Sequence, residues 1–266
     1  MSVTAEQLAR IALDAGEVIM SIYETDFDIT QKSDSSPVTE ADEKAEALIL
    51  EALRAIDPDL VLMAEESVAA GHTPEHGDRF ALIDPLDGTK EFVNKRGEFT
   101  VNIAIIEHGT PVMGVVYAPA LERLFVAEDR FTAWEAPAQP GAPVPNESAR
   151  KLLRIRKTPD AGITAIASKS HRSEETNSFL NLFNVADIIS AGSSLKFCLV
   201  AAGEADLYPR HGRTMEWDTA AGQAVAEAAG ARVTTVDLEP LSYGKKERGY
   251  DNPHFIVWGD LEPRNS

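Results

Sequence analysis

The segment from Ala81 to Lys90 constrains this chain more than any other, because an apolar run ends abruptly in two closely spaced aspartates. Phe80 to Ile83 has the pattern of a buried strand, Asp84 follows it directly, and Asp87 comes three residues later. Open sheets commonly bind ligands at the carboxyl ends of their strands. Two carboxylates on so tight a turn repel each other unless a cation lies between them. Such hard oxygen ligands suit magnesium or manganese better than zinc.

Two other acidic motifs strengthen this interpretation. Glu65-Glu66 ends a second apolar run, and Asp218 opens a run of small residues with helical character. Each motif also has a simpler explanation: an Asp-Gly turn with a cap at Thr89, a pair of solvated glutamates, and an N-cap at Asp218. A phosphoryl-transfer site with several metal ions needs several carboxylates. These three motifs would supply them from separate parts of the chain, at strand ends or helix starts.

The pattern of apolar residues predicts how these motifs are arranged. Helical spacing indicates two helices, Leu8–Ile22 and Ala41–Ile56, and short β-type runs follow as far as Ala127. Beyond the proline-rich segment 136–148, strands and helices alternate up to Trp258. We expect a layered α+β and α/β sandwich, with alternating helical and sheet layers.

We expect a single catalytic domain over residues 1–266, built from two intimate lobes. The proline-rich segment favours approximate lobes of 1–148 and 149–266. The first lobe would carry most of the acidic motifs, and the second would carry Asp218.

Composition excludes several classes of protein. The formal net charge of −18 makes nucleic-acid binding or a polybasic membrane anchor a poor expectation, although a small phosphorylated ligand is compatible with it. The single cysteine, Cys198, cannot form an internal disulfide. No signal peptide or spanning segment is visible, so we expect a cytoplasmic protein. Loose attachment to the inner face of a membrane, and the choice between monomer and homodimer, stay open.

The acidic motifs resemble a known family. Asp84–Thr89 and Trp217–Gly222 are similar to the two signatures of the lithium-sensitive, magnesium-dependent phosphatases that include the inositol monophosphatases. Within that superfamily, the chain most resembles the 3′(2′),5′-bisphosphate nucleotidases of bacterial sulfur metabolism. The segments that extend the resemblance, from about Leu8 to Trp258, are Asp34–Asp42, Gly97–Ala104, Ser168–His171, Gly192–Val200 and Leu207–Arg210. The chain departs from the family pattern in 69–79 and 131–156.

The resemblance implies a sugar-phosphatase-like fold and a site with two or three Mg²⁺ ions, for which Mn²⁺ can substitute. Glu65, Asp84 and the carbonyl of Leu86 would hold one ion, and Asp84, Asp87 and Asp218 a second. Thr89, oriented by Asp42, would align the attacking water. Asp42 also fits a capping box that begins at Thr39, and it can serve both purposes only if its carboxylate faces the site.

The resemblance also implies a small phosphorylated nucleotide as the substrate. The residues it places at the substrate are Glu65, Asp87, Gly88, Thr89, Lys90, His171, Ser193, Ser194, Lys196, Arg210 and Asp218. The expected reaction removes the 3′-phosphate of 3′-phosphoadenosine 5′-phosphate, and 3′-phosphoadenylyl sulfate is a further possible substrate. The alternatives are a phosphatase for inositol phosphates or sugar bisphosphates, and a non-catalytic module that senses nucleotides or metals.

Overall fold

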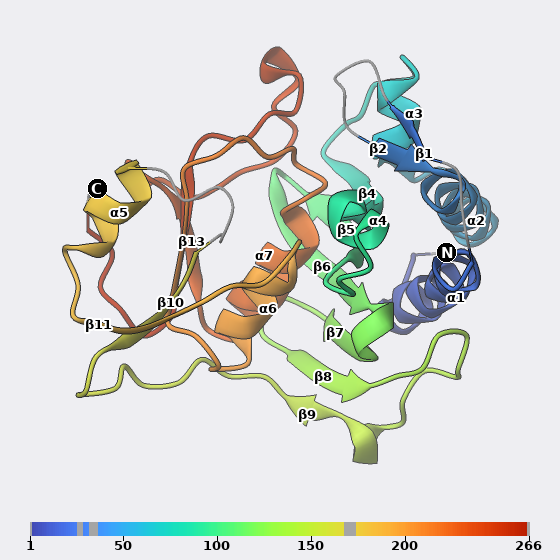
Figure 1. Ribbon diagram of the computed structural model, residues 1–266. Helices are drawn as coiled ribbons and strands as arrows, with labels where there is room; N and C mark the ends of the chain where they lie inside the picture. The colour runs from blue at the N-terminus through green and yellow to red at the C-terminus, as the bar shows by residue number, and fades with distance from the viewer. Residues whose placement is uncertain (1, 26–28, 32–36, 168–173, 265–266) are drawn as a thin grey trace.

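Alternating layers of helix and sheet build the molecule (Figure 1). The computed structural model describes residues 2–25, 29–31, 37–167 and 174–264. From right to left in Figure 1, the layers are a helix pair, a large sheet, a second helix pair, a smaller sheet and a short outer helix. The expected layered α/β sandwich is therefore confirmed.

The helices lie in three of these layers. Helices α1 (Ala5–Tyr23) and α2 (Glu40–Ile56) form the first layer, α6 (Leu195–Ala201) and α7 (Ala220–Ala228) the central one, and α5 (Glu174–Leu180) the outer one. Two single-turn helices, α3 (Glu65–Ala69) and α4 (Thr89–Val93), begin at residues that the sequence marked as functional.

The large sheet has the strand order β3-β4-β5-β6-β7-β8-β9 among the described residues. Only β3 and β4 are parallel; every other neighbouring pair in it is antiparallel. Its strands are β3 (Val61–Ala64), β4 (Arg79–Asp87), β5 (Thr100–Glu107), β6 (Thr110–Ala118), β7 (Arg123–Ala127), β8 (Ala133–Pro137) and β9 (Lys151–Leu152).

The smaller sheet has the strand order β11-β10-β12-β14-β13. Here β10 is parallel to both of its neighbours, whereas β14 is antiparallel to β12 and β13. The strands are β10 (Ile163–Ile166), β11 (Val185–Ile189), β12 (Leu207–Arg210), β13 (Arg232–Thr235) and β14 (Phe255–Trp258). A separate hairpin pairs β1 (Ile29–Gln31) with β2 (Pro37–Thr39).

Three apolar clusters hold the layers together. The first joins α1 and α2 to one face of the large sheet, with Leu8 and Phe99 fully buried in it. The second fills the space between the two sheets around α6 and α7, and includes Phe197 and Phe255. The third covers the outer face of the smaller sheet, where Phe179 of α5 contacts Trp258. Removing this much apolar surface from water is the main stabilising term for such a fold.

Two features of the large sheet were not predicted from sequence. Strand β8 runs into the proline-rich segment, β9 follows that segment, and both add to the same sheet. That sheet therefore continues past residue 148, where we expected a boundary between lobes, and the smaller sheet begins with β10. Within the described residues, we find no helix whose length and apolar character would let it cross a membrane.

Candidate metal centre and phosphate pocket

Strand β4 carries the two aspartates of the first motif through a β-bulge. Asp84 pairs with Asn102 and Asp87 with Thr100, so β4 contains one residue more than its partner between these points. Pro85 fits this position because it has no N–H to offer to the sheet. The strand therefore continues to Asp87, instead of ending in a turn at Asp84 as the sequence suggested. The N–H of Leu86 donates to Oδ1 of Asp84 over 3.1 Å, which helps to fix that carboxylate.

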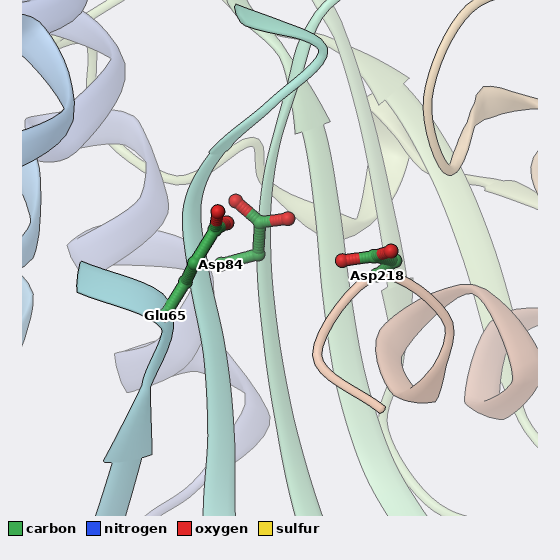
Figure 2. Close-up of side chains that lie close together, drawn as sticks. All are labelled: Glu65, Asp84 and Asp218. Atoms are coloured by element: carbon green, nitrogen blue, oxygen red, sulfur yellow. The ribbon is translucent and has the colours of Figure 1, made fainter. Parts of the chain in front are cut away.

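Three carboxylates from distant parts of the sequence meet beside this bulge (Figure 2). Glu65 begins α3, Asp84 lies on the neighbouring strand β4, and Asp218 lies in the turn before α7. One oxygen atom from each lies within 4.8 Å of the others. In Figure 2 the Asp84 carboxylate lies between the other two. The predicted convergence of these three acids is therefore present in the structure.

Mutual repulsion and burial perturb the acids at this centre. Burial raises the pKa of Asp87 to about 6, and the negative charges of Glu65 and Glu91 act in the same direction. Burial also raises the pKa of Asp218 well above its usual value, with further contributions from Asp87 and Glu65. Both aspartates would hold their negative charge more readily beside a cation, because a positive charge offsets the cost of burial. The donor set, all oxygen, fits a hard divalent cation.

Gly88 and Ser193 bring the end of β4 and the segment before α6 together beside the acidic cluster. Gly88 has φ = +94°, a conformation that L side chains rarely adopt, and a Cβ placed on it would lie 2.2 Å from Oγ of Ser193. That hydroxyl donates to the carbonyl of Asp87 over 2.7 Å and lies 3.0 Å from the carbonyl of Glu98. The neighbouring Ser194 hydroxyl donates to the carbonyl of Asp218 over 2.6 Å. Both predicted serines thus use their hydroxyls to tie backbone segments together.

Asp42 and Thr89 meet although they are distant in sequence. The Thr89 hydroxyl donates to Oδ1 of Asp42 over 3.2 Å. The other carboxylate oxygen, Oδ2, accepts the N–H and the hydroxyl of Thr39 at 2.8 and 2.7 Å, and so closes the capping box of α2. Asp42 therefore caps the helix and faces the site at the same time.

A pocket of about 180 Å³ opens beside the acidic cluster, and three cationic side chains line it: Lys90, Lys196 and Arg210. Lys196 is 9% exposed, and burial together with the nearby Arg210 lowers its pKa to about 8 despite the opposing charge of Asp87. The Nε of Arg210 is buried and has no hydrogen-bond partner among the described residues. Buried donors are nearly always satisfied, so this nitrogen is suited to an anionic ligand. The pocket is lined by Asp87, Gly88, Lys90, Glu91, Ala191, Gly192, Ser193, Lys196, Phe197, Tyr208, Arg210, Thr214, Asp218 and Thr219.

Most of the residues expected at the substrate line this pocket or the acidic cluster. Lys90 lies at the exposed side of the pocket. His171 lies outside the described residues, as does the segment from Asp34 to Ser36 that forms part of the family resemblance. Sequence reasoning missed Glu46, a buried acid of α2 that contacts the start of α3. The sequence did contain one indication of Glu46: it follows Asp42 by four residues, so the two side chains lie on the same helix face.

Comparison with known proteins matches this architecture to one family. The model of the inositol monophosphatase family matches residues 1–257. Among curated proteins, the 3′(2′),5′-bisphosphate nucleotidases CysQ of Shigella flexneri and Escherichia coli K12 are each 42% identical over 254 residues, covering 95% of this chain and 98% of theirs. The crystal structure of CysQ from Bacteroides thetaiotaomicron superposes with a TM-score of 0.81 at 39% identity, covering 97% of both chains. An inositol monophosphatase from Anabaena sp. PCC 7120, at 23% identity, has a TM-score of 0.73 and covers 96% of this chain and 90% of its own, which shows the shared fold.

Proposed function

This chain belongs to the inositol monophosphatase family, and we propose on that premise that it is a 3′(2′),5′-bisphosphate nucleotidase of sulfur metabolism. The reaction removes the 3′-phosphate of 3′-phosphoadenosine 5′-phosphate and releases AMP and inorganic phosphate. The observation that carries this proposal is the pocket that reaches from Asp218 of the acidic cluster to Lys196 and Arg210, because a nucleotide bisphosphate needs one site for each phosphate.

Enzymes of this family use divalent metal ions, and we propose Mg²⁺ as the ion used here. The residues that would hold the ions are Glu65, Asp84, Asp87, Asp218 and the carbonyl of Leu86. The three carboxylate groups within 4.8 Å of one another and the raised pKa values of Asp87 and Asp218 support this set. When bound, such ions supply positive charge for the phosphate oxygens and increase the acidity of water.

The Thr89–Asp42 pair orients the attacking water. Because the Thr89 hydroxyl donates its hydrogen to Asp42, its oxygen lone pairs are available to accept a hydrogen from water. Asp42 is itself held by Thr39 at the start of α2, so the pair is fixed in position before substrate binds. Holding a nucleophile in a fixed orientation removes entropy that would otherwise add to the barrier.

Lys196 and Arg210 bind the phosphate that is not cleaved. Lys196 loses solvation by burial, and an anionic ligand would restore the stability of its charged form. The buried Nε of Arg210 gains a hydrogen-bond acceptor from the same phosphate. Two cations in one small pocket also explain how a chain of net charge −18 attracts a highly anionic substrate. We propose that His171 adds to this recognition.

The competing functions differ in what they require of this pocket. Inositol monophosphates carry a single phosphate and would leave the two cations unmatched, whereas a sugar bisphosphate would use them. Measurements of phosphate release with and without Mg²⁺ distinguish these functions. The substrates compared are 3′-phosphoadenosine 5′-phosphate, 3′-phosphoadenylyl sulfate, inositol 1-phosphate and fructose 1,6-bisphosphate. The nucleotide should have the highest kcat/KM. Preference for an inositol phosphate would reject the assignment, and absence of any phosphate release would favour a sensing module.

A further inference from the structure

Helix α3 begins without a cap of its own. Its N-cap residue is Ala64, whose side chain has no atom that can accept a hydrogen bond. The missing acceptor comes from Glu46 on α2, which lies 20 residues before Glu66. The Glu46 carboxylate accepts the N–H of Glu66 over 2.8 Å, and it accepts the N–H and the hydroxyl of Ser67 over 2.9 and 2.6 Å.

This cap lies next to the metal centre without being part of it. Glu65 is the first residue of α3, so the hydrogen bonds to Glu46 hold the helical turn that carries the Glu65 side chain. Glu46 is 5% exposed and does not belong to the group of carboxylates within 4.8 Å of one another. Without it, two N–H groups at the start of α3 would lose their acceptor in a partly buried region.

One face of α2 therefore serves two parts of the site. Asp42 and Glu46 are four residues apart, so their side chains project from the same face of the helix. Asp42 contacts the Thr89 hydroxyl at 3.2 Å, and Glu46 contacts the turn that begins with Glu65. The first two turns of α2 thereby connect Thr89 and Glu65 through a single rigid element.

We propose that Glu46 is a positioning residue for the metal ligand Glu65, and that its three hydrogen bonds set the affinity of the site for a divalent cation. This inference rests on the proposed metal site. A residue that only stabilised the fold would lower the melting temperature and leave the affinity for the cation unchanged. Loss of a positioning residue weakens the affinity for the cation. The Glu65 carboxylate would then adopt several conformations, and cation binding would have to select one of them.

The test measures Mg²⁺ binding by titration calorimetry on the full chain, together with Mg²⁺ activation of phosphate release. Three variants separate position from charge. Glu46→Asp keeps the charge and shortens the side chain, Glu46→Gln keeps the length and removes the charge, and Ser67→Ala removes one of the three hydrogen bonds. We expect the dissociation constant for Mg²⁺ to rise about 10-fold to 100-fold for the two Glu46 variants, the range typical of residues that orient metal ligands. Ser67→Ala should cause a smaller rise in the same direction.

Two controls account for stability and for surface charge. Asp206→Asn removes another buried acid that accepts a backbone N–H, from Thr164, and pairs with Arg156 away from the site. It should lower the melting temperature and leave the Mg²⁺ dissociation constant at the wild-type value. Glu43→Gln, at an exposed position of α2, should change neither.

Each outcome decides the inference. Weaker Mg²⁺ binding in both Glu46 variants, with unchanged binding in the controls, supports it. Wild-type affinity in Glu46→Asp combined with weak binding in Glu46→Gln would show that only the charge matters, and would overturn it. Wild-type affinity in both would reduce Glu46 to a structural cap. If the wild-type protein itself bound no divalent cation, the proposed metal site would fail, and the inference with it.

Discussion

The hydroxyl of Thr89 lies 3.2 Å from Oδ1 of Asp42, and the two residues are 47 positions apart in the sequence. The second oxygen of the same carboxylate closes the capping box of α2 by accepting the N–H of Thr39. The carboxylate is thus held from one side by a helix end and presents its other oxygen to Thr89. One carboxylate therefore both caps a helix and fixes the Thr89 hydroxyl, the group that we propose aligns the attacking water.

The Asp42–Thr89 pair predicts that the decreases in kcat caused by substituting each residue are not additive in free energy when both are substituted. Thr89→Ala and Asp42→Asn should each lower kcat by about 10²-fold to 10⁴-fold, because each removes the alignment of the same water. The double variant should be scarcely slower than the worse single one. Thr89→Ser, which keeps the hydroxyl, is the matched control and should retain most of the activity. Losses that multiply in the double variant would show that the two residues act separately.

Metal removal should abolish the activity. Excess chelator should stop phosphate release, and adding back Mg²⁺ or Mn²⁺ should restore it, because crowded carboxylates need a counter-charge. Ca²⁺ should inhibit, since it is larger and accepts looser coordination. Asp84→Asn should cost more than Asp218→Asn, because Asp84 is proposed to contact both ions. Activity that survives thorough chelation would contradict the proposed site.

Arg210 should contribute to substrate selectivity. Arg210→Ala removes the buried Nε that has no partner among the described residues, and should raise KM for 3′-phosphoadenosine 5′-phosphate about tenfold to a hundredfold. Hydrolysis of a simple monophosphate should change little. Arg213→Ala is the matched control, because Arg213 is largely exposed and pairs with Asp251. Equal losses on both substrates would place Arg210 in the catalytic core. Lys196→Ala and His171→Ala should behave as Arg210→Ala does.

The contact between Gly88 and Ser193 predicts a severe effect from a single methyl group. Gly88→Ala would place a Cβ 2.2 Å from the Ser193 hydroxyl, so the β4–α4 turn or the serine must move. Gly71 has a similar φ of +87°, but a Cβ added there would meet no atom within 4 Å, which makes Gly71→Ala the matched control. Both variants should lose about 1–2 kcal/mol of unfolding free energy through the backbone conformation. Only Gly88→Ala should lose activity and further stability, as measured by kinetics and denaturant titration.

The half-buried Glu227 of α7 should make stability depend on pH. Burial raises its pKa from 4.5 to about 7, so the folded state binds a proton more tightly than the unfolded state does. The free energy of unfolding should therefore be highest below about pH 4.5 and fall as the pH rises to about 7, by up to about 3 kcal/mol from this group alone.

Glu227→Gln tests this dependence directly. The amide cannot ionise and still accepts from Gln223, whose Nε2 lies 3.0 Å from the Glu227 carboxylate. The variant should therefore be more stable than the wild type at pH 8 and similar to it at pH 4.5, by denaturant titration. The exposed Glu43→Gln should leave the difference between the two pH values as in the wild type. An equal effect of Glu227→Gln at both pH values would rule out titration as the cause.

The longest periodic segments of the sequence predicted their elements best. Leu8–Ile22 and Ala41–Ile56 became α1 and α2, because their apolar stripes span several turns and their ends carry capping boxes. Strands β8 and β9 were missed. β8 ends in proline and β9 has two exposed residues, so neither has a period-2 apolar pattern. Pairing with a neighbour, which a local pattern does not contain, makes them strands.

The acidic cluster was predictable because each member follows an apolar run or precedes a helix in the sequence, although Asp84 lies within β4 and not at its end. The roles of the two serines were not predictable in the same way. Their acceptors are backbone carbonyls of Asp87, Glu98 and Asp218, which leave no mark on the sequence of the serine segment. Only the spacing of Glu46 from Asp42 pointed to it, because its partners are the N–H groups of Glu66 and Ser67, 20 and 21 residues later.

The position of α6 and α7 between the two sheets has a consequence for biosynthesis. These helices cover the face of the large sheet opposite α1 and α2, and they follow that sheet in the sequence. While a ribosome is still making the smaller sheet, the nascent chain already holds the strands from β3 to β9 with one apolar face exposed to solvent. Exposed sheet faces of this kind are prone to aggregation. The emerging chain is therefore most in need of a chaperone during this interval. Asp218, which completes the acidic cluster, is synthesised only near the end of the interval.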